Sequence, residues 1–222
     1  MQRIWVWDIW VRIFHWALVL VLIVSFYTMK TEGYPLMFPV DWHARAGYTV
    51  LGLLLFRWLW GFFGSRHARF LNFLRSPFES GRYLWLFLRG RAPSYAGHNP
   101  LGGWMMLIML LSLTLQAGSG LFLHDDILFE APLYGSVSDG TTKLLTTIHN
   151  YNGNFLLILV GLHIAAVVVH RLKGEKLVGA MFNGHKRLVS APVDGPGTRA
   201  VQWRAVVMLV LAVGLMTWLW NS

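Results

Sequence analysis

One apolar segment, residues 144–171, constrains the fold of this chain more than any other feature. It is long enough to cross a bilayer, which takes about 20 apolar residues in an α-helix, yet it contains His149, His163 and His170. At about 100° per residue, the fourteen residues from His149 to His163 end about 40° short of four full turns. These two imidazoles therefore point to the same side of one helix, about 21 Å apart along its axis.

Histidines in an apolar helix have two interpretations. A single histidine there is usually a hydrogen-bonded packing residue, but an ionisable residue inside a membrane is costly and is by default a functional hypothesis. Because a hydrocarbon core is about 30 Å thick, this helix would place one imidazole near each membrane face. That geometry can hold two metal centres stacked across a bilayer, provided that other helices supply partner ligands.

The composition is that of an integral membrane protein. Of the 222 residues, 55% are hydrophobic and none is cysteine. The absence of cysteine excludes disulfides, thiolate iron–sulfur clusters and covalently attached c-type heme, which needs a Cys-x-x-Cys-His motif. Any heme in this chain is therefore held by histidine or methionine and is b-type.

The net charge of +9 follows membrane topology rather than nucleic-acid binding. Residues 64–100 contain six Arg and one acidic residue, and residues 171–204 contain seven Lys or Arg and two acidic residues. Between them, residues 124–143 contain four acidic residues and one Lys. Basic loops that alternate with an acidic one match the positive-inside pattern, so we expect no nucleic-acid partner.

Five apolar stretches predict membrane-spanning helices. The first lacks a small-x-small cleavage site, so it is predicted to be a retained helix rather than a signal peptide. Pro100 suits the first turn of the third helix, and Ser138 or Asp139 can cap the fourth. The predicted spans are residues 13–29, 42–63, 101–123, 144–171 and 203–220.

The segments between the spans complete the predicted architecture. Residues 77–91 are aromatic and basic and too short to span, which predicts a helix in the inner interface. We expect an all-α membrane protein with a four-helix transmembrane bundle within residues 1–187. A Pro/Gly-rich linker, residues 188–202, leads to a fifth transmembrane helix within the C-terminal residues 203–222.

Four histidines sort into two pairs at matched membrane depth. With the N-terminus inside, His15 lies near the inner face and His43 near the outer face. On the fourth span, His149 is outer and His163 is inner. The sequence therefore predicts an outer pair, His43 with His149, and an inner pair, His15 with His163.

Two imidazoles per site suit a heme better than zinc. Imidazoles on both axial positions give a six-coordinate, low-spin heme, whereas a zinc site would lack the further ligands of a tetrahedron. Two such hemes would carry electrons across the membrane. His98 and His124 flank the third span and are interpreted as interfacial residues without metal. Met105, Met106 and Met109 are interpreted as packing residues.

Further candidates lie near these pairs. Arg57 is fourteen residues after His43, on the same helix face, and is either a snorkelling interfacial cation or a partner of a heme propionate. Gly47 and Gly153 each lie one turn past an outer histidine, where glycine lets a flat macrocycle approach the backbone. His170 shares the ligand face with His163 and is predicted to be a propionate or quinone neighbour.

Several short motifs are distinctive: VRIFHW (11–16), WHARAGY (42–48), GHNPLGG (97–103), LVGAMFNGHK (177–186), the His149–His163 spacing, and Arg57 fourteen residues after His43. In these features the chain resembles the bacterial cytochrome b561 and nickel–iron hydrogenase cytochrome b-subunit superfamily, over about residues 1–187. The resemblance implies a four-helix bundle, two non-covalent b hemes, and electron exchange between a quinone pool and a partner. Arg12, within VRIFHW, is a further candidate cofactor-binding residue. The fifth helix departs from the four-span pattern.

Two functions follow from this resemblance. The first is an electron-transfer subunit in the bacterial inner membrane, with its N-terminus cytoplasmic and its C-terminus periplasmic. It would link quinone to an outer redox protein, such as a c-type cytochrome or a hydrogenase, and is compatible with a homo-oligomer. The acidic loop 125–139 either attracts that partner or simply reflects topology. The alternative is a superoxide oxidase with a positive outer pocket, for which Lys30, Arg45 and Lys143 lie at the right depth.

Overall fold

A computed structural model describes residues 2–30, 40–124, 129–188 and 190–221. Asp125 and Asp126 of the acidic loop and the side chain of Lys30 lie outside the described residues. The chain divides into two compact units. The first comprises residues 1–13, 57–109 and 159–206, and the second comprises residues 14–56, 110–158 and 207–222.

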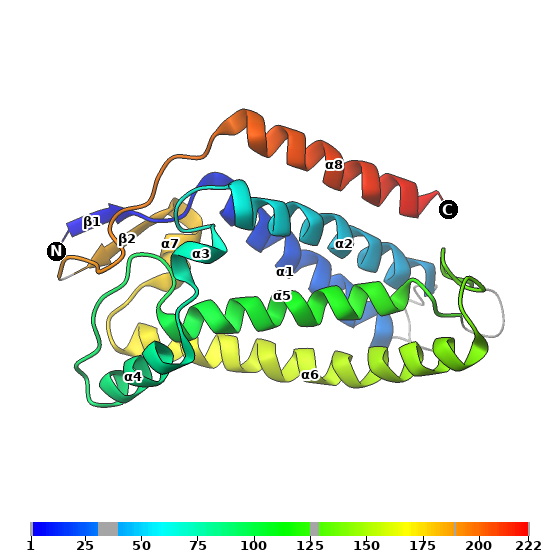
Figure 1. The fold of residues 1–222 in the computed structure, drawn as a ribbon, viewed down its shortest axis with the longest axis horizontal. Helices are drawn as coiled ribbons and strands as arrows, with labels where there is room; N and C mark the ends of the chain where they lie inside the picture. Colours follow the sequence, from blue (N-terminus) through cyan, green and yellow to red (C-terminus); the bar gives the residue numbers. More distant parts are fainter. Residues whose placement is uncertain (1, 31–39, 125–128, 189, 222) are drawn as a thin grey trace. The chain divides into compact units, whose positions relative to one another are not determined.

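The five predicted membrane-spanning helices are confirmed. They are α1 (Ile9–Lys30), α2 (Val40–Phe63), α5 (Pro100–Gly120), α6 (Asp139–Leu172) and α8 (Gln202–Trp220), each long and apolar enough to cross a membrane (Figure 1). Helix α6 has 34 residues. At about 1.5 Å per residue it is about 51 Å long, so it exceeds a hydrocarbon core of about 30 Å.

Side-chain caps set where two of these helices begin. Helix α1 begins four residues before the predicted span because the Asp8 carboxylate accepts hydrogen bonds from the backbone N–H of Trp10 (2.8 Å) and Val11 (2.9 Å). A carboxylate at this position satisfies N–H groups that have no partner inside the helix. At the start of α6, Ser138 Oγ accepts from the Thr141 N–H at 3.3 Å, as the sequence predicted.

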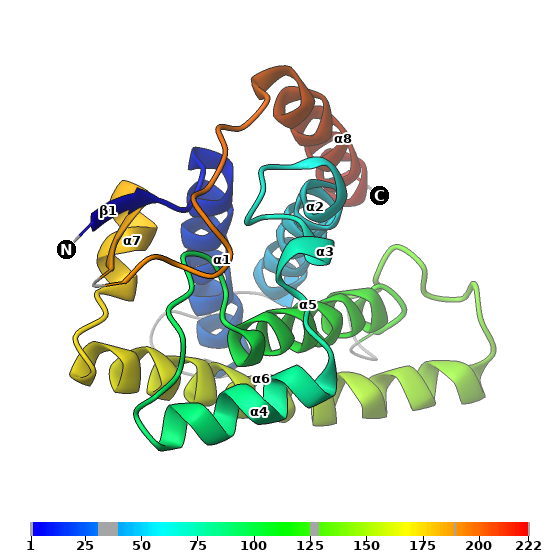
Figure 2. The same cartoon turned by 60° about the vertical axis from the view of Figure 1, so that its left-hand side comes forward.

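The first unit contains a small sheet that the sequence analysis did not predict. Strand β1 (Gln2–Trp5) pairs antiparallel with β2 (His185–Leu188). Helix α7 (Leu177–Asn183) precedes β2, and Figures 1 and 2 both show β1 beside α7. Gly184, at φ 76°, ends α7, and its carbonyl accepts from the N–H of Val6 at 2.8 Å. The N-terminus is thereby fixed to the end of the LVGAMFNGHK segment.

The remaining short helices of the first unit are α3 (Phe70–Phe73) and α4 (Pro77–Leu88). Helix α4 corresponds to the predicted interfacial helix. It begins with a capping box in which Ser76 and Glu79 each bind the other's backbone N–H. One face buries Ser80 and Tyr83, whereas Phe78 is 81% exposed. The exposed aromatic surface agrees with a position in the membrane interface.

Residues 188–202 pack within the first unit. The Asp194 carboxylate accepts hydrogen bonds from the N–H of Ala96 (2.7 Å) and Gly97 (2.8 Å). Thr198 Oγ1 accepts from the Arg66 N–H at 2.9 Å, and Gly197 N–H donates to the Trp5 carbonyl at 2.8 Å. This linker is therefore held in place by specific hydrogen bonds.

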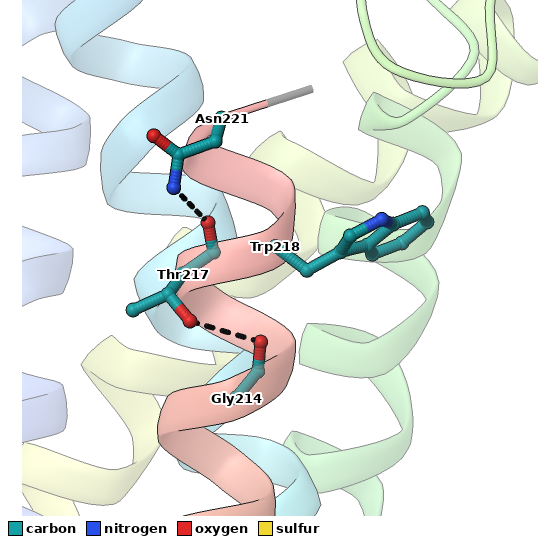
Figure 3. Close-up of a pocket in the computed structure, with 4 residues that line it drawn as sticks. All are labelled: Gly214, Thr217, Trp218 and Asn221. Atoms are coloured by element: carbon teal, nitrogen blue, oxygen red, sulfur yellow. Dashed lines mark hydrogen bonds between the residues drawn. The ribbon is translucent and has the colours of Figure 1, made fainter.

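Helix α8 packs closely on α2 within the second unit. A Cβ added at Gly52 would lie 2.9 Å from the Ala212 carbonyl oxygen and 3.2 Å from Met216 Cβ. On another part of α8, Gly214, Thr217, Trp218 and Asn221 line a shallow surface pocket (Figure 3). Thr217 and Asn221 donate to carbonyls of their own helix there, at 3.1 Å and 2.6 Å, so this pocket offers few free polar groups.

We predict that Gly52→Ala destabilises the second unit, because its methyl group would collide with backbone rather than with a flexible side chain. Overpacking of this kind costs about 1–3 kcal/mol. Thermal unfolding of the purified protein measures the loss. Gly214→Ala is the matched control, since a Cβ there meets no atom within 4 Å. Equal unfolding temperatures for the two variants would contradict the close α2–α8 contact.

A second prediction concerns Glu175, whose carboxylate lies 2.7 Å from Lys186 Nζ and 3.5 Å from His170 Nδ1. Burial alone would raise the pKa of Glu175, but hydrogen bonding to His170 and the charge of Lys186 lower it to about 2 from its ordinary 4.5. A depressed carboxyl pKa stabilises the fold above about pH 4.5, and this contribution disappears as the pH falls through about 2.

Glu175→Gln should therefore lower the thermal unfolding temperature at pH 7, and its difference from the wild type should shrink as the pH falls below 4.5. Glu130→Gln, at an exposed position, is the control. A difference that stays constant from pH 7 to pH 3 would show that the ion pair does not stabilise the fold.

Candidate functional site

His43 of α2 and His149 of α6 face each other within the second unit. Their ring centroids are 6.3 Å apart, and the ring planes make an angle of 78°. The sequence predicted this outer pair from membrane depth alone, and the structure brings the two rings together.

Backbone carbonyls fix the orientation of both rings. His43 Nδ1 lies 3.0 Å from the Ser25 carbonyl of α1, and His149 Nδ1 lies 3.0 Å from the Gln116 carbonyl of α5. Because a carbonyl only accepts, each Nδ1 carries the proton, and each neutral ring keeps its lone pair on Nε2. This is the arrangement of histidines that bind a metal through Nε2.

The separation of the rings fits one metal ion between them. A metal–imidazole bond is about 2.0 Å, and the nitrogen lies about 1.15 Å from the ring centroid, so two opposed ligands place their centroids about 6.3 Å apart. The observed distance is 6.3 Å. Among the described residues there is no cluster of three or more His, Asp or Glu side chains that could hold a metal ion. The residues present fit a six-coordinate heme rather than a tetrahedral zinc site.

Small residues surround this outer pair. A Cβ at Gly47 would meet no atom within 4 Å, so there is open space beside α2. At Gly153 a Cβ would make an ordinary contact with Gln116 Nε2 at 3.6 Å. Gly120 of α5, which the sequence analysis missed, is closer to the site, since its Cβ would lie 3.2 Å from His149 Cε1. Only three-dimensional packing reveals the role of Gly120.

A polar network behind His149 supports the carbonyl that orients it. Asn152 Nδ2 donates to the Gln116 side-chain oxygen at 2.8 Å and to the Ser112 carbonyl at 2.9 Å. Ser112 Oγ donates to Asn152 Oδ1 at 2.7 Å. These buried hydrogen bonds fix the turn of α5 that carries Gln116.

The predicted inner histidines occupy their expected helices. His163 lies on α6 in the first unit, and His15 lies on α1 in the second, where its ring packs edge-on against Trp16 at 5.0 Å. The pairing of His15 with His163 stays a prediction from the sequence.

Arg57 is buried, with only 3% of its surface exposed, so it is not a cation that reaches to the water interface. Its Nη2 donates to the Ala68 carbonyl at 3.2 Å and approaches Met106 Sδ at 3.8 Å. The guanidinium also lies over the Phe70 ring at 5.3 Å. Its Nη1 is buried and has no hydrogen-bond partner among the residues that the structure describes. A buried cation with a spare donor suits an anionic group.

Asp8 is a buried polar residue that the sequence analysis missed. It is 1% exposed, and besides capping α1 it accepts from Trp60 Nε1 at 3.1 Å and from the Ser65 hydroxyl. Its position just before an apolar helix was the available signal, since Asp is a preferred N-cap. Four donors satisfy this carboxylate, so it joins the start of α1 to the end of α2.

Two other candidates have partners in the first unit. Arg12 donates to the Phe182 carbonyl at the end of α7. His170 Nε2 lies 3.3 Å from Asn99 Nδ2. The Asn99 side-chain oxygen accepts from the Gly102 N–H at 2.8 Å, which identifies Nδ2 as the donor toward His170. With that lone pair in use, His170 is a poorer metal ligand than His163.

Two further histidines lie in the loops of the first unit. The ring of His98 packs against Trp7 at 4.9 Å and Phe73 at 5.0 Å. Burial, together with the nearby positive charge of Arg57, lowers the pKa of His98 to about 3, so it is neutral. His67 is 3% exposed and lies 3.6 Å from Asp194. The sequence analysis did not single out His67, because its partner is more than a hundred residues away.

Two of the outer cations of the superoxide alternative, Arg45 and Lys143, have side chains that the structure describes. Arg45 lies over the rings of Trp42 at 5.8 Å and Trp220 at 5.6 Å. Lys143 is exposed on α6.

Comparisons with known proteins show which family the chain belongs to. The model of the family described as prokaryotic cytochrome b561 matches residues 6–184. The chain is also 27% identical over 219 residues to a probable Ni/Fe-hydrogenase B-type cytochrome subunit of Rhizobium leguminosarum bv. viciae, covering 83% of this chain and 89% of the relative. No solved structure matches. The chain thus belongs to the prokaryotic cytochrome b561 family, as a multi-pass membrane cytochrome that binds b-type heme and takes part in electron transfer.

Proposed function

We propose that the chain binds two b hemes, each between two histidines. His43 and His149 are the ligands of the outer heme, and His15 and His163 are those of the inner heme. The observation that carries this proposal is the opposed outer pair, whose Nδ1 atoms are both engaged by carbonyls at 3.0 Å. Bound heme supplies reversible one-electron chemistry, and imidazoles on both sides leave no open position for a substrate.

The two hemes would connect the membrane faces. His149 and His163 are separated by about 21 Å along α6. Positive-inside loops support a cytoplasmic N-terminus and a periplasmic C-terminus in the bacterial inner membrane. In this topology the outer heme exchanges electrons with a periplasmic redox protein, and the inner heme exchanges them with membrane quinone.

The name of the Rhizobium relative supports a hydrogenase-like protein as the outer partner, with a c-type cytochrome as the other candidate. Reduction of the purified protein by a reduced partner, followed by quinone reduction, tests this function. Quinone reduction driven by superoxide alone, with no partner present, would instead support the oxidase alternative.

The ligand assignment predicts which heme each histidine holds. His43→Ala and His149→Ala should each remove the same heme, because one imidazole cannot fill both axial positions, and His15→Ala and His163→Ala should remove the other. A pyridine hemochrome assay should give two hemes per wild-type chain and one per single variant. His170→Ala is the control and should keep both hemes. Loss of the inner heme in His170→Ala but not in His163→Ala would refute the assignment.

We also propose that Arg57 binds a propionate of the inner heme. Arg57→Leu should then lower the midpoint potential of that heme, because a nearby positive charge disfavours the oxidised, more positive iron. Spectroelectrochemical titration measures both hemes. Arg69→Leu, at an exposed position, is the control. A shift confined to the outer heme, or no shift, would exclude this role.

A further inference from the structure

The first unit contains a second buried side-chain nitrogen that has no hydrogen-bond partner among the described residues. His67 Nε2 is buried without a hydrogen-bond partner, like Arg57 Nη1. Leaving such a group unpaired in the interior is unfavourable. Trp5 Nε1 and His170 Nδ1 are the other buried side-chain nitrogens without a hydrogen-bond partner among the described residues of this unit, and an acceptor from outside the chain would satisfy those of Arg57 and His67.

The two groups lie close together. Arg57 Nη2 donates to the carbonyl of Ala68, the residue that follows His67. His98 lies near both side chains, since the positive charges of Arg57 and His67 each contribute to lowering the pKa of His98. The charge of His163, the proposed inner-heme ligand within this unit, also contributes to lowering the pKa of His98.

The other side of the His67 ring is firmly held. Nδ1 faces the Asp194 carboxylate at 3.6 Å. Gly97 permits this packing, because a Cβ there would lie 2.6 Å from Nδ1. Asp194 is in turn fixed by the N–H groups of Ala96 and Gly97. Burial lowers the pKa of His67, and the charge of Asp194 opposes that shift. An aspartate behind an imidazole also orients the ring.

We propose that His67, positioned by Asp194, hydrogen-bonds through Nε2 to an inner-heme propionate beside Arg57. This contact is a hydrogen bond with one proton between Nε2 and the propionate oxygen, and its formation consumes no other reactant. The charged and titratable groups around His67 are Asp194 and Arg66, with His98 nearby. The linker that carries Asp194 is thereby part of the cofactor site. This inference rests on the proposed function.

The test compares His67→Leu, which removes the donor, with His67→Gln, which keeps an N–H donor of similar length. His185→Gln, in β2 of the same unit, is the control. Heme content is measured first, and then both midpoint potentials, with the inner heme identified as the one that remains in His43→Ala. His67→Leu should lower the midpoint potential of the inner heme by about 59 mV, which corresponds to a tenfold change in its ratio of oxidised to reduced form. His67→Gln should recover most of that shift, and the outer heme should not change.

Inner-heme potentials of both His67 variants equal to that of His185→Gln would overturn the proposal. Loss of the inner heme from His67→Gln as well as from His67→Leu would also overturn it, because a retained donor should still hold the propionate. If only His67→Leu loses the heme, redox-difference infrared spectra of His67→Gln and the wild type provide the test. The propionate bands of the two proteins should differ, and identical bands would refute the contact. A wild-type chain without heme would refute the proposed function itself, whereas unresponsive hemes would refute only this inference.

Discussion

The structure depends on keeping imidazole lone pairs available inside an apolar membrane bundle. A buried polar group must be hydrogen-bonded, yet a metal ligand must leave one nitrogen free. The chain satisfies both requirements with backbone carbonyls. Ser25 on α1 and Gln116 on α5 each accept from the Nδ1 of a histidine on another helix, at 3.0 Å. The outer pair therefore needs four helices: two carry the rings and two orient them.

The first unit handles buried charge in a different way. Asp8 is satisfied by four donors from the chain itself, and Glu175 by Lys186 and His170. Arg57 and His67 instead keep unpaired nitrogens in the interior. Unpaired buried donors are rare in folded proteins. We therefore assign different roles to the paired carboxylates and to these two unpaired nitrogens. The satisfied groups join chain segments, and the unsatisfied ones are suited to an anionic ligand.

Local sequence patterns predicted most of the helices and the outer site, but not the contacts between distant segments. Hydropathy and length define the spans, and the 3.6-residue period puts His149 and His163 on one face. The β1–β2 pairing joins residues 2–5 to 185–188, and His67 meets Asp194 across 127 positions. Neither short strand has an apolar alternation to reveal it, and Asp194 lies in a stretch with linker composition. Gly120 was missed for a similar reason, because its closeness to His149 arises only from the packing of α5 on α6.

The central claim is that His43 and His149 bind one heme iron from opposite sides. Electron paramagnetic resonance of the oxidised protein tests it most directly. The two ring planes, at 78°, are nearly perpendicular. Perpendicular imidazoles leave two d orbitals of the iron close in energy, and the low-spin signal is then strongly anisotropic. This account predicts such a signal in the wild type and in His163→Ala, where the outer heme is alone. A high-spin signal in His163→Ala, which would mean an open or weakly bound axial position at the outer iron, would contradict it.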